Sequence, residues 1–447
     1  ISHKEMNDSQ VLNFNAGSQA FYGMMKLTII SGTPTIMGAV LSPGYSQNLF
    51  APLYYLPMMI ESDSPFSISV QSLPSSSVAQ SELNFYSPRE TPEGFNKIGN
   101  FLYHSPLIKG VSVPTPVEKF VDRTVTYKTP STIMLCGGKG AGKSTFSRYV
   151  VNKLLSNDRK VVYLDLDPGQ PEFSLPGVLS LTFIDSFSLL PPEHNTMNRN
   201  QIKIYYGSNS PNDNLEYFMQ CIKYLMDQYR QIAFRDKSDE SDSFLVVNSF
   251  GWIQDLGFTI HQELINDIIK PKQVILLYSP DTTPPQLAEK MFKYQVQPKP
   301  GVVPISPLIH RNIRIHTYFK RNRDYLVLQQ PNCIQLRDVR ISFITIRVPP
   351  TEALTVLSGS IVGLLKDPRH FPRSQTLVSL LKEPPLCPCV GFGFIRSIDK
   401  EKGLLYIIIP ENEVEFNTIA LGNIFTPAQF FNETSLVAPN YLGVGLL

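Results

Sequence analysis

Gly137-Gly138-Lys139-Gly140-Ala141-Gly142-Lys143-Ser144-Thr145 is the stretch that decides the fold of this chain. It matches G-x-x-x-x-G-K-[ST], the phosphate-binding P-loop. Its glycines let the backbone curl so that several N–H groups point at one anion. Lys143 brings a cation to the β- and γ-phosphates, and the Ser144 hydroxyl is suited to bind Mg²⁺. Residues 137–145 are therefore predicted to bind a nucleoside triphosphate.

The residues on either side of the loop fit a strand followed by a helix. Residues 132–136 form a short apolar run, as expected of a buried parallel strand. Residues 146–155 carry apolar side chains at helical spacing, and Ser156-Asn157-Asp158 ends that helix. The positive N-terminal end of the helix favours phosphate binding. A chance glycine-rich turn would lack this flanking pattern.

Strands and helices alternate from about residue 126 to residue 330. Further buried strands are predicted at 160–165, 243–248 and 273–278, and helices at 215–229 and around 264–269. This pattern predicts an α/β fold with a central P-loop NTPase-type parallel sheet and helices on both faces. Ligands then bind at the carboxyl ends of the strands.

The segments before and after this region are expected to be β-rich. Residues 1–125 show weak helical periodicity, and runs at 27–30 and 35–41 flank a turn as in a hairpin. The alternating run at 339–346 and the apolar run at 404–409 predict strands near the C-terminus. We predict a β-rich N-terminal domain (1–125), a P-loop domain (126–330) and a β-rich C-terminal domain (331–447).

Composition limits the class of protein. The 447 residues carry a net charge of +2, so any nucleic-acid site must be a local patch. The five cysteines include Cys387-Pro388-Cys389 without a second pair at metal spacing, so we expect no zinc site and a reducing compartment. No run of 18 apolar residues predicts a membrane span. The chain begins at Ile1, so we expect it to be a piece of a longer protein.

Two acids follow the predicted strand at 160–165, in the sequence Asp165-Leu166-Asp167-Pro168-Gly169-Gln170. Acids at i and i+2 on a strand point the same way. In a P-loop protein this position faces the metal and the γ-phosphate. One carboxylate then holds Mg²⁺, and the other accepts a proton from an attacking hydroxyl. The alternative is a solvated loop or a helix cap.

The single tryptophan, Trp252, lies just after the predicted strand at 243–248, in Asn248-Ser249-Phe250-Gly251-Trp252. An indole at the carboxyl end of a strand can stack on a nucleobase, and Ser249 can contact a phosphate. The alternative is that Trp252 is a core residue.

Basic residues gather between 310 and 323. Arg311 and Arg314 lie three apart, so a helix places them on one face. Guanidinium groups suit the spread charge of a phosphoryl transition state. The alternative is a solvated helix face.

Residues 436–447 form an apolar, uncharged tail. It is either a last strand of the C-terminal core or a peptide that docks into a partner protein.

The P-loop, the Asp165–Gln170 sequence and the Asn248–Trp252 sequence, in this order between two β-rich regions, resemble the eukaryotic RNA 5′-hydroxyl kinase family. Residues 167–173 and 206–211 are similar to its nucleolar branch. The resemblance implies ATP and Mg²⁺ as cofactors and transfer of the γ-phosphate to RNA 5′-hydroxyl ends. It also implies work at the second internal transcribed spacer of pre-ribosomal RNA. The implied partner is a HEPN-type endoribonuclease, bound through the apolar tail, in the nucleus and nucleolus.

The resemblance implies a role for each candidate residue. Lys143 and Ser144 bind phosphates and Mg²⁺, and Asp167 binds the metal and activates the RNA hydroxyl. Ser249 and Trp252 match a clasp for the terminal nucleotide, with Ser249 where the family usually has threonine. The remaining implied residues are Asp165 and Gln170 around the metal and the RNA end, and the lid arginines Arg311 and Arg314.

Two other functions remain open. The first is a non-catalytic, ATP-binding scaffold of an RNA-processing complex. The second is a regulatory GTPase, against which the chain lacks the guanine-reading [NT]-K-x-D sequence.

Overall fold

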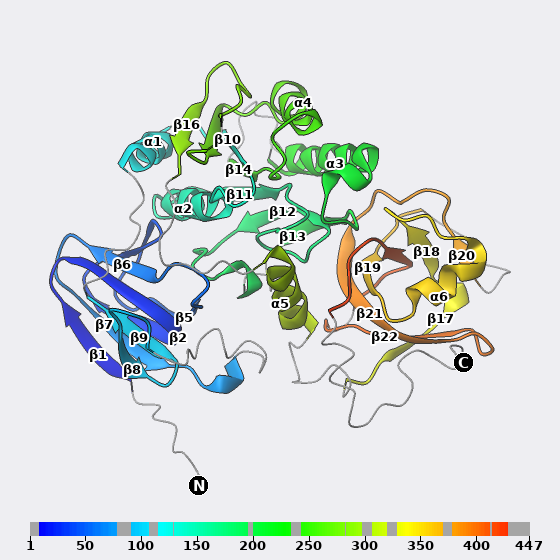
Figure 1. The fold of residues 1–447 in the computed structure, drawn as a ribbon, viewed down its shortest axis with the longest axis horizontal. Coiled ribbons are helices and arrows are strands. Elements are labelled where there is room, and N and C mark those ends of the chain that lie inside the picture. The colour runs from blue at the N-terminus through cyan, green and yellow to red at the C-terminus, as the bar shows by residue number, and fades with distance from the viewer. Residues whose placement is uncertain are drawn as a thin grey trace, which may run out of the picture.

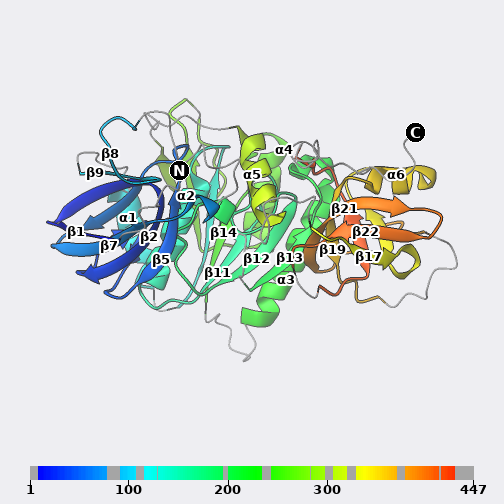
Figure 2. The ribbon, with the colours of Figure 1, turned by 90° about the horizontal axis from the view of Figure 1, so that it is seen from below.

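The computed structural model describes residues 9–77, 91–106, 115–127, 129–194, 200–233, 243–281, 283–296, 306–319, 329–369, 378–411 and 414–427. These residues form a β-rich N-terminal unit, a central α/β unit and a β-rich C-terminal unit, which follow one another along the molecule (Figures 1 and 2). The predicted fold class is confirmed. The charged run at 236–242, the basic residues 320–323 and the apolar tail lie outside the described residues.

The central sheet has the strand order β13-β12-β11-β14-β10-β15-β16. Five neighbouring strands are parallel. They are β11 (Val161–Asp165), β14 (Phe244–Asn248), β10 (Thr132–Gly137), β15 (Gln273–Tyr278) and β16 (Phe292–Gln295). Four of them are buried apolar runs as predicted, and the fifth, the partly exposed edge strand β16, was not predicted. β12 (Val178–Ile184), next to β11, and the edge strand β13 (Gln201–Tyr205) pair antiparallel, and the sequence pattern revealed neither of them. No crossover helix separates β11 from β12, so the chain returns in the opposite direction.

Helices cover both faces of this sheet. On one face, Val121 of α1 (Thr115–Val125) and Val150 of α2 (Lys143–Leu155) pack with Leu135 of β10. On the other face, Ile222 of α3 (Leu215–Ala233) and Ile260 of α4 (Leu256–Glu263) share a cluster with strand residues. The helix α4 continues as a π-helical turn, η5 (Leu264–Ile268). α1 falls within the range predicted for the N-terminal domain, yet it packs on the central unit.

The N-terminal unit is built around the long strand β2, which pairs with β5, β6, β7 and β9. The predicted hairpin between 27–30 and 35–41 is wrong. Residues 35–41 instead fold on themselves as β3 and β4, because Met37 and Gly38 turn the chain with φ of 47° and 82°. The elements are β1 (Gln10–Phe14), β2 (Gly17–Ser31), β3 (Thr35–Ile36), β4 (Ala39–Val40), β5 (Ser46–Ala51), β6 (Met58–Ser62), β7 (Phe66–Ser72), η1 (Ser75–Ser77), β8 (Asn96–Gly99) and β9 (Leu102–Ser105).

The C-terminal unit shares a hydrophobic core with the central unit. Phe392 and Phe394 belong to the same buried cluster as Tyr205 and Leu225. The elements are β17 (Asn332–Gln335), η7 (Leu336–Asp338), β18 (Arg340–Phe343), η8 (Pro350–Glu352), α6 (Ala353–Leu357), β19 (Ile361–Leu365), β20 (Ser379–Leu380), β21 (Cys389–Asp399), β22 (Leu404–Ile408) and β23 (Thr418–Leu421).

One helix, α5 (Pro307–Phe319), touches all three units (Figure 1). The ring of His310 lies 5.3 Å from Tyr54 of the N-terminal unit. At the other end of α5, the Tyr318 hydroxyl donates a hydrogen bond to the Glu411 carboxylate. The same hydroxyl accepts the Phe392 N–H at 3.0 Å, which fixes α5 to the C-terminal unit. Short helical turns at η3 (Pro192–His194) and η4 (Pro211–Asp213) complete the described elements.

Over the described residues, none of the helices combines the length and the apolar character that a membrane crossing requires.

Candidate active site

The P-loop joins β10 to α2 in the backbone conformation that its glycines predict. Gly137, Gly140 and Gly142 have φ of 153°, 72° and 81°. A Cβ atom at Gly137 would lie 2.4 Å from the carbonyl oxygen of Leu277 on the neighbouring strand. Glycine is therefore required at position 137 by sterics as well as by conformation.

Lys143 opens α2 and turns back over the loop. Its side chain is buried, and Nζ donates hydrogen bonds to the carbonyl oxygens of Gly137 at 2.9 Å and Gly138 at 3.0 Å. Burial lowers the pKa of Lys143, while the charge of Asp167 acts in the opposite direction. The ammonium group is thus held beside the loop backbone, where a phosphate would bind.

Most other P-loop residues are more exposed than Lys143. Ser144 is half-buried at the first turn of α2, whereas Lys139, Gly140 and Thr145 are exposed and Ala141 is half-buried. The first N–H groups of a helix lack partners within that helix, so they attract an anion. All nine residues predicted to bind ATP therefore lie on one loop and its adjoining helix turn.

Asp165 is fully buried at the end of β11, and both of its carboxylate oxygens accept hydrogen bonds. Oδ2 accepts the backbone N–H of Glu172. Oδ1 accepts the Asn248 side-chain amide at 3.0 Å and the Asp167 N–H at 3.3 Å. Burial raises the pKa of Asp165 to about 7. Asp165 thus ties β14 and the loop after β11 together.

Asp167 lies two residues further on and is only half-buried. Its Oδ1 atom accepts N–H groups of Gly169 at 3.0 Å and Gln170 at 3.2 Å, which shapes the loop. Its charge opposes the lowering of the pKa at both Lys143 and Arg311. Of the two predicted acids, Asp167 is the one placed among the cations, with Gln170 exposed beside it.

Arg311 and Arg314 both lie on α5, as predicted, but in different surroundings. Arg311 is half-buried, and burial lowers its pKa while the charge of Asp167 opposes this. Arg314 is 5% exposed and donates to the carbonyl oxygen of Ser174 at 3.2 Å. The alternative of a solvated helix face is therefore wrong for Arg314. Arg314 fastens α5 to the loop after β11, and Arg311 lies within the field of Asp167.

Ser249 and Trp252 follow β14, whose neighbours in the sheet are β10 and β11. Ser249 is fully buried and hydrogen-bonded to the Phe250 carbonyl at 3.4 Å. Trp252 is half-buried and packs against the central core, with Gly257 beneath its indole. A Cβ atom at Gly251 would lie 2.9 Å from Lys139 Cγ, so this segment packs against the P-loop.

A buried ion pair that the sequence analysis missed lies behind these loops. Arg148 Nε of α2 is 3.3 Å from Glu172 Oε1, and the Glu172 side chain is fully buried. The signal in the sequence is weak, because a charge on an amphipathic helix ordinarily indicates its solvated face. Glu172 is one of the residues similar to the nucleolar branch, but nothing in the sequence pairs it with Arg148.

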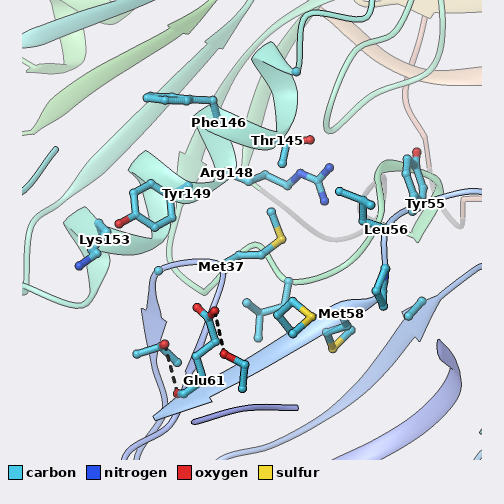
Figure 3. A pocket seen from close by; sticks show the side chains of 18 of the residues that line it. Met37, Tyr55, Leu56, Met58, Glu61, Thr145, Phe146, Arg148, Tyr149 and Lys153 are labelled. Carbon is cyan, nitrogen blue, oxygen red and sulfur yellow. Dashed lines mark hydrogen bonds between the residues drawn. The ribbon is translucent and has the colours of Figure 1, made fainter. Parts of the chain in front are cut away.

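A cavity of about 760 Å³ opens between the N-terminal unit and the P-loop helix (Figure 3). The P-loop contributes Ala141 and Gly142 to its lining, so the cavity begins where the phosphate site ends. Its size suits a small ligand. Figure 3 shows Met37, Leu56 and Met58 from the N-terminal unit on one side of it and Arg148 and Tyr149 from α2 on the other.

The oxygen atoms near the P-loop fit a magnesium ion shared with phosphate. Within the described ranges, no group of three or more His, Cys, Asp or Glu side chains forms a metal site. Mg²⁺ instead usually takes one or two protein oxygens, water and substrate phosphates. The Ser144 hydroxyl and the Asp167 carboxylate are hard oxygen donors on adjacent loops, so this pair fits such a site.

Comparisons with known proteins give relatives over the same region. A family model described as "mRNA cleavage and polyadenylation factor CLP1 P-loop" matches residues 137–321. Polynucleotide 5′-hydroxyl-kinase NOL9 of Bos taurus is 29% identical over 363 residues, covering 66% of this chain and 50% of that protein. The Arabidopsis thaliana protein of the same name is 28% identical over 327 residues, covering 64% of this chain and 83% of its own length. Polynucleotide 5′-hydroxyl-kinase GRC3 of Candida glabrata is 27% identical over 372 residues, covering 71% and 56%.

The chain spans about half the length of the Bos taurus and Homo sapiens relatives. Among solved structures, the wild-type Clp1p–Pcf11p complex contains a chain that superimposes with a TM-score of 0.64 at 15% identity. The match covers 94% of this chain and 98% of the other. At this identity, the likeness concerns the fold.

Proposed function

We propose, on the premise that this chain is a homologue of the polynucleotide 5′-hydroxyl kinases, that it transfers the γ-phosphate of ATP to 5′-hydroxyl ends of RNA. One observation carries the proposal. The carboxylate of Asp167 follows the carboxyl end of β11, which only β14 separates from the P-loop strand β10, and its charge acts on both Lys143 and Arg311. A P-loop alone binds a nucleotide, whereas an acid between two cations also provides for a hydroxyl acceptor.

The nucleotide occupies two adjoining places. The P-loop N–H groups and Lys143 hold the β- and γ-phosphates. The nucleoside lies in the cavity that begins at Ala141 and Gly142, between Met37 and Tyr149. Bound Mg²⁺, held by Ser144 and Asp167, would neutralise charge on the phosphates.

Transfer follows from the positions of the charged groups. The RNA 5′-oxygen forms a bond to the γ-phosphorus as its proton passes to the Asp167 carboxylate. The bond from the γ-phosphorus to the bridging oxygen breaks, and ADP leaves. Lys143 and Arg311 stabilise the negative charge that spreads over the transferring group. Asp165, with both oxygens engaged, fixes the loop that carries Asp167.

The acceptor end of the RNA is proposed to lie between the loops after β11 and β14. Trp252 is half-buried, so part of its indole remains accessible for stacking on the terminal base. Gln170 is exposed next to Asp167. Ser249 is buried, so its contribution is to hold the start of the Trp252 segment.

Transfer to RNA decides this proposal. The chain is incubated with γ-labelled ATP and Mg²⁺ and an RNA with a 5′-hydroxyl end, and the same RNA with a 5′-phosphate is the control. Label is expected only on the 5′-hydroxyl RNA. Tight ATP binding without transfer, also after adding a partner endoribonuclease, would favour the scaffold alternative. A preference for GTP in binding would favour the GTPase alternative.

We also propose the finer role that the family resemblance implies. The substrate is pre-ribosomal RNA cut in its second internal transcribed spacer, and the partner is a HEPN-type endoribonuclease that leaves the 5′-hydroxyl. The site of action is the nucleolus. The uncharged apolar tail at 436–447 supports a docked peptide. A pull-down from cell extract with and without residues 436–447 tests it, because the nuclease is expected to bind only when the tail is present.

A further inference from the structure

Arg148 and Glu172 form an ion pair that is almost completely removed from water. Arg148 is 8% exposed and Glu172 is 0% exposed. Removing two charges from water costs hydration energy that their mutual attraction often fails to repay, so such a pair is weak evidence for stability alone. The neighbouring contacts of the pair lead to the P-loop helix on one side and to the loop after β11 on the other.

Both members of the pair also bind loops of the candidate active site. Arg148 Nε lies 3.4 Å from the carbonyl oxygen of Ser144, one helical turn before it on α2. The Glu172 N–H donates to Asp165, whose other oxygen accepts the Asp167 N–H at 3.3 Å.

A continuous series of contacts thus runs from Ser144, in the first turn of the P-loop helix, to the candidate base Asp167. The Arg148 guanidinium is further fixed from outside the series. Its Nη1 atom donates to the carbonyl oxygen of Leu190 at 3.4 Å. Arg148 also lines the cavity beside the P-loop, toward Leu56 of the N-terminal unit (Figure 3). The guanidinium is therefore held by Glu172, by the Ser144 carbonyl and by the Leu190 carbonyl.

We propose that Arg148 and Glu172 are positioning residues that set the separation between the Ser144 hydroxyl and the Asp167 carboxylate for a shared Mg²⁺. The assignment rests on the proposed function, because it takes these two groups as metal ligands. Mg²⁺ demands nearly ideal octahedral geometry at about 2.0–2.1 Å, so it is sensitive to small shifts of its ligands. Residues behind metal ligands typically change metal affinity by about 10–100-fold when mutated.

Nucleotide binding with and without the metal tests this assignment. The variants are Glu172→Gln, which keeps the size of the side chain but removes its charge, and Arg148→Lys, which keeps the charge but loses the planar guanidinium group. Affinity for a fluorescent ATP analogue is measured in Mg²⁺ and in EDTA. The matched control is Arg230→Lys, since Arg230 pairs with Asp227 on α3 and binds the Ile268 carbonyl, away from the P-loop.

The expected result is selective for the metal. The gain in affinity that Mg²⁺ gives, taken as the ratio of the affinities in Mg²⁺ and in EDTA, falls by about 10-fold or more in both variants. Affinity in EDTA stays within about two-fold of wild type in Glu172→Gln, whose side chain does not line the cavity, whereas Arg148 lines it and is judged by the ratio alone. Arg230→Lys keeps the full gain. An unchanged Mg²⁺ gain, or equal losses in Mg²⁺ and EDTA, would overturn the assignment and leave the pair a purely structural one. If Glu172→Gln does not fold, Arg148→Lys decides alone.

This measurement is independent of RNA. A wild-type chain that gains affinity from Mg²⁺ but phosphorylates no RNA end would refute the proposed function without touching the assignment. A chain that phosphorylates RNA while both variants keep the Mg²⁺ gain would refute only the assignment.

Discussion

Asn152, a fully buried residue of the P-loop helix, donates a 3.0 Å hydrogen bond to the carbonyl oxygen of Met37 in the N-terminal unit. The same side chain exchanges hydrogen bonds with the backbone of Ser188, whose N–H donates at 2.8 Å. One amide therefore connects the N-terminal unit, the loop after β12 and the helix that begins at Lys143. The wall of the cavity beside the P-loop depends on this contact, because Met37 lines it.

Replacing Asn152 by Ala is expected to lower the free energy of unfolding by about 2–4 kcal/mol, since several buried backbone groups lose their partner. Denaturant unfolding measures the loss. The control is Asn157→Ala, at the exposed end of the same helix, where the side chain only bonds the Lys153 carbonyl. Equal losses in the two variants would show that Asn152 is not a special contact.

Lys143→Ala is expected to reduce kcat for phosphoryl transfer by about 100-fold or more, because a buried cation at the phosphates is removed. Lys139→Ala changes an exposed lysine of the same loop and is expected to leave kcat within a few-fold. Steady-state kinetics with ATP and 5′-hydroxyl RNA compare the two. Similar effects at both positions would mean that the loop needs positive charge in general.

The two acids are expected to fail in different ways. Asp167→Asn keeps an oxygen for the N–H groups of Gly169 and Gln170, so it folds and binds ATP but loses about 100-fold or more in kcat. Asp165→Asn places an amide donor against existing donors, so it loses about 1–3 kcal/mol of stability. Thermal unfolding and transfer assays separate these outcomes. An active Asp167→Asn variant would exclude Asp167 as the base.

Substitutions at Arg311 and Arg314 are also expected to have different effects, one on phosphoryl transfer and the other on stability. Arg311→Gln removes a cation in the field of Asp167 and is expected to lower kcat by about 1,000-fold with little change in the unfolding temperature. Arg314→Gln loses the buried bond to Ser174 and is expected to lower the unfolding temperature first. A loss of transfer in Arg314→Gln at unchanged stability would reverse these roles.

His261 predicts a pH dependence of stability. Its Nδ1 atom donates to the Gly257 carbonyl at 2.8 Å, and burial lowers its pKa from 6.5 to about 4. Because the unfolded chain binds the proton more readily, the stability that neutral His261 provides is present above pH 6.5 and lost as the pH falls toward 4. That loss is on the order of 3 kcal/mol.

The measurement compares wild type with His261→Gln. Free energies of unfolding are determined at pH 7 and pH 4.5, and the wild type is expected to lose more stability than the variant over this interval. Parallel losses would mean that other groups cause the acid sensitivity.

Local patterns predicted the centre of the fold well. β10, α2, β11, β14 and β15 were predicted because buried parallel strands read as short apolar runs and the P-loop fixes the order of two elements. The antiparallel strands β12 and β13 were missed, since no periodic helix marks their connection. α1 was missed because it follows a β-rich stretch, although Val121 and Val125 fit a helix that packs on the central sheet.

For the candidate site, too, local patterns predicted some features and missed others. Motif spacing identified Lys143 and both acids without assigning their roles. The family resemblance gave Asp167 the role of base and Asp165 a supporting role, and the full burial of Asp165 agrees with that division. The ion pair of Arg148 and Glu172 joins residues from two elements, and the cavity beside the P-loop is formed by two units. Such features arise from long-range packing, which no local pattern contains.

The attachment of α5 at both ends has a mechanical consequence. His310 is held by the N-terminal unit and Tyr318 by the C-terminal unit, with Arg311 one residue from the first attachment. Because both ends of α5 are attached, the position of this helix depends on the distance between the N-terminal and C-terminal units. Any displacement of the outer units relative to each other must therefore shift α5 or break one attachment. Either event changes the position of the Arg311 guanidinium. The placement of this side chain near Asp167 therefore depends on how the three units are assembled.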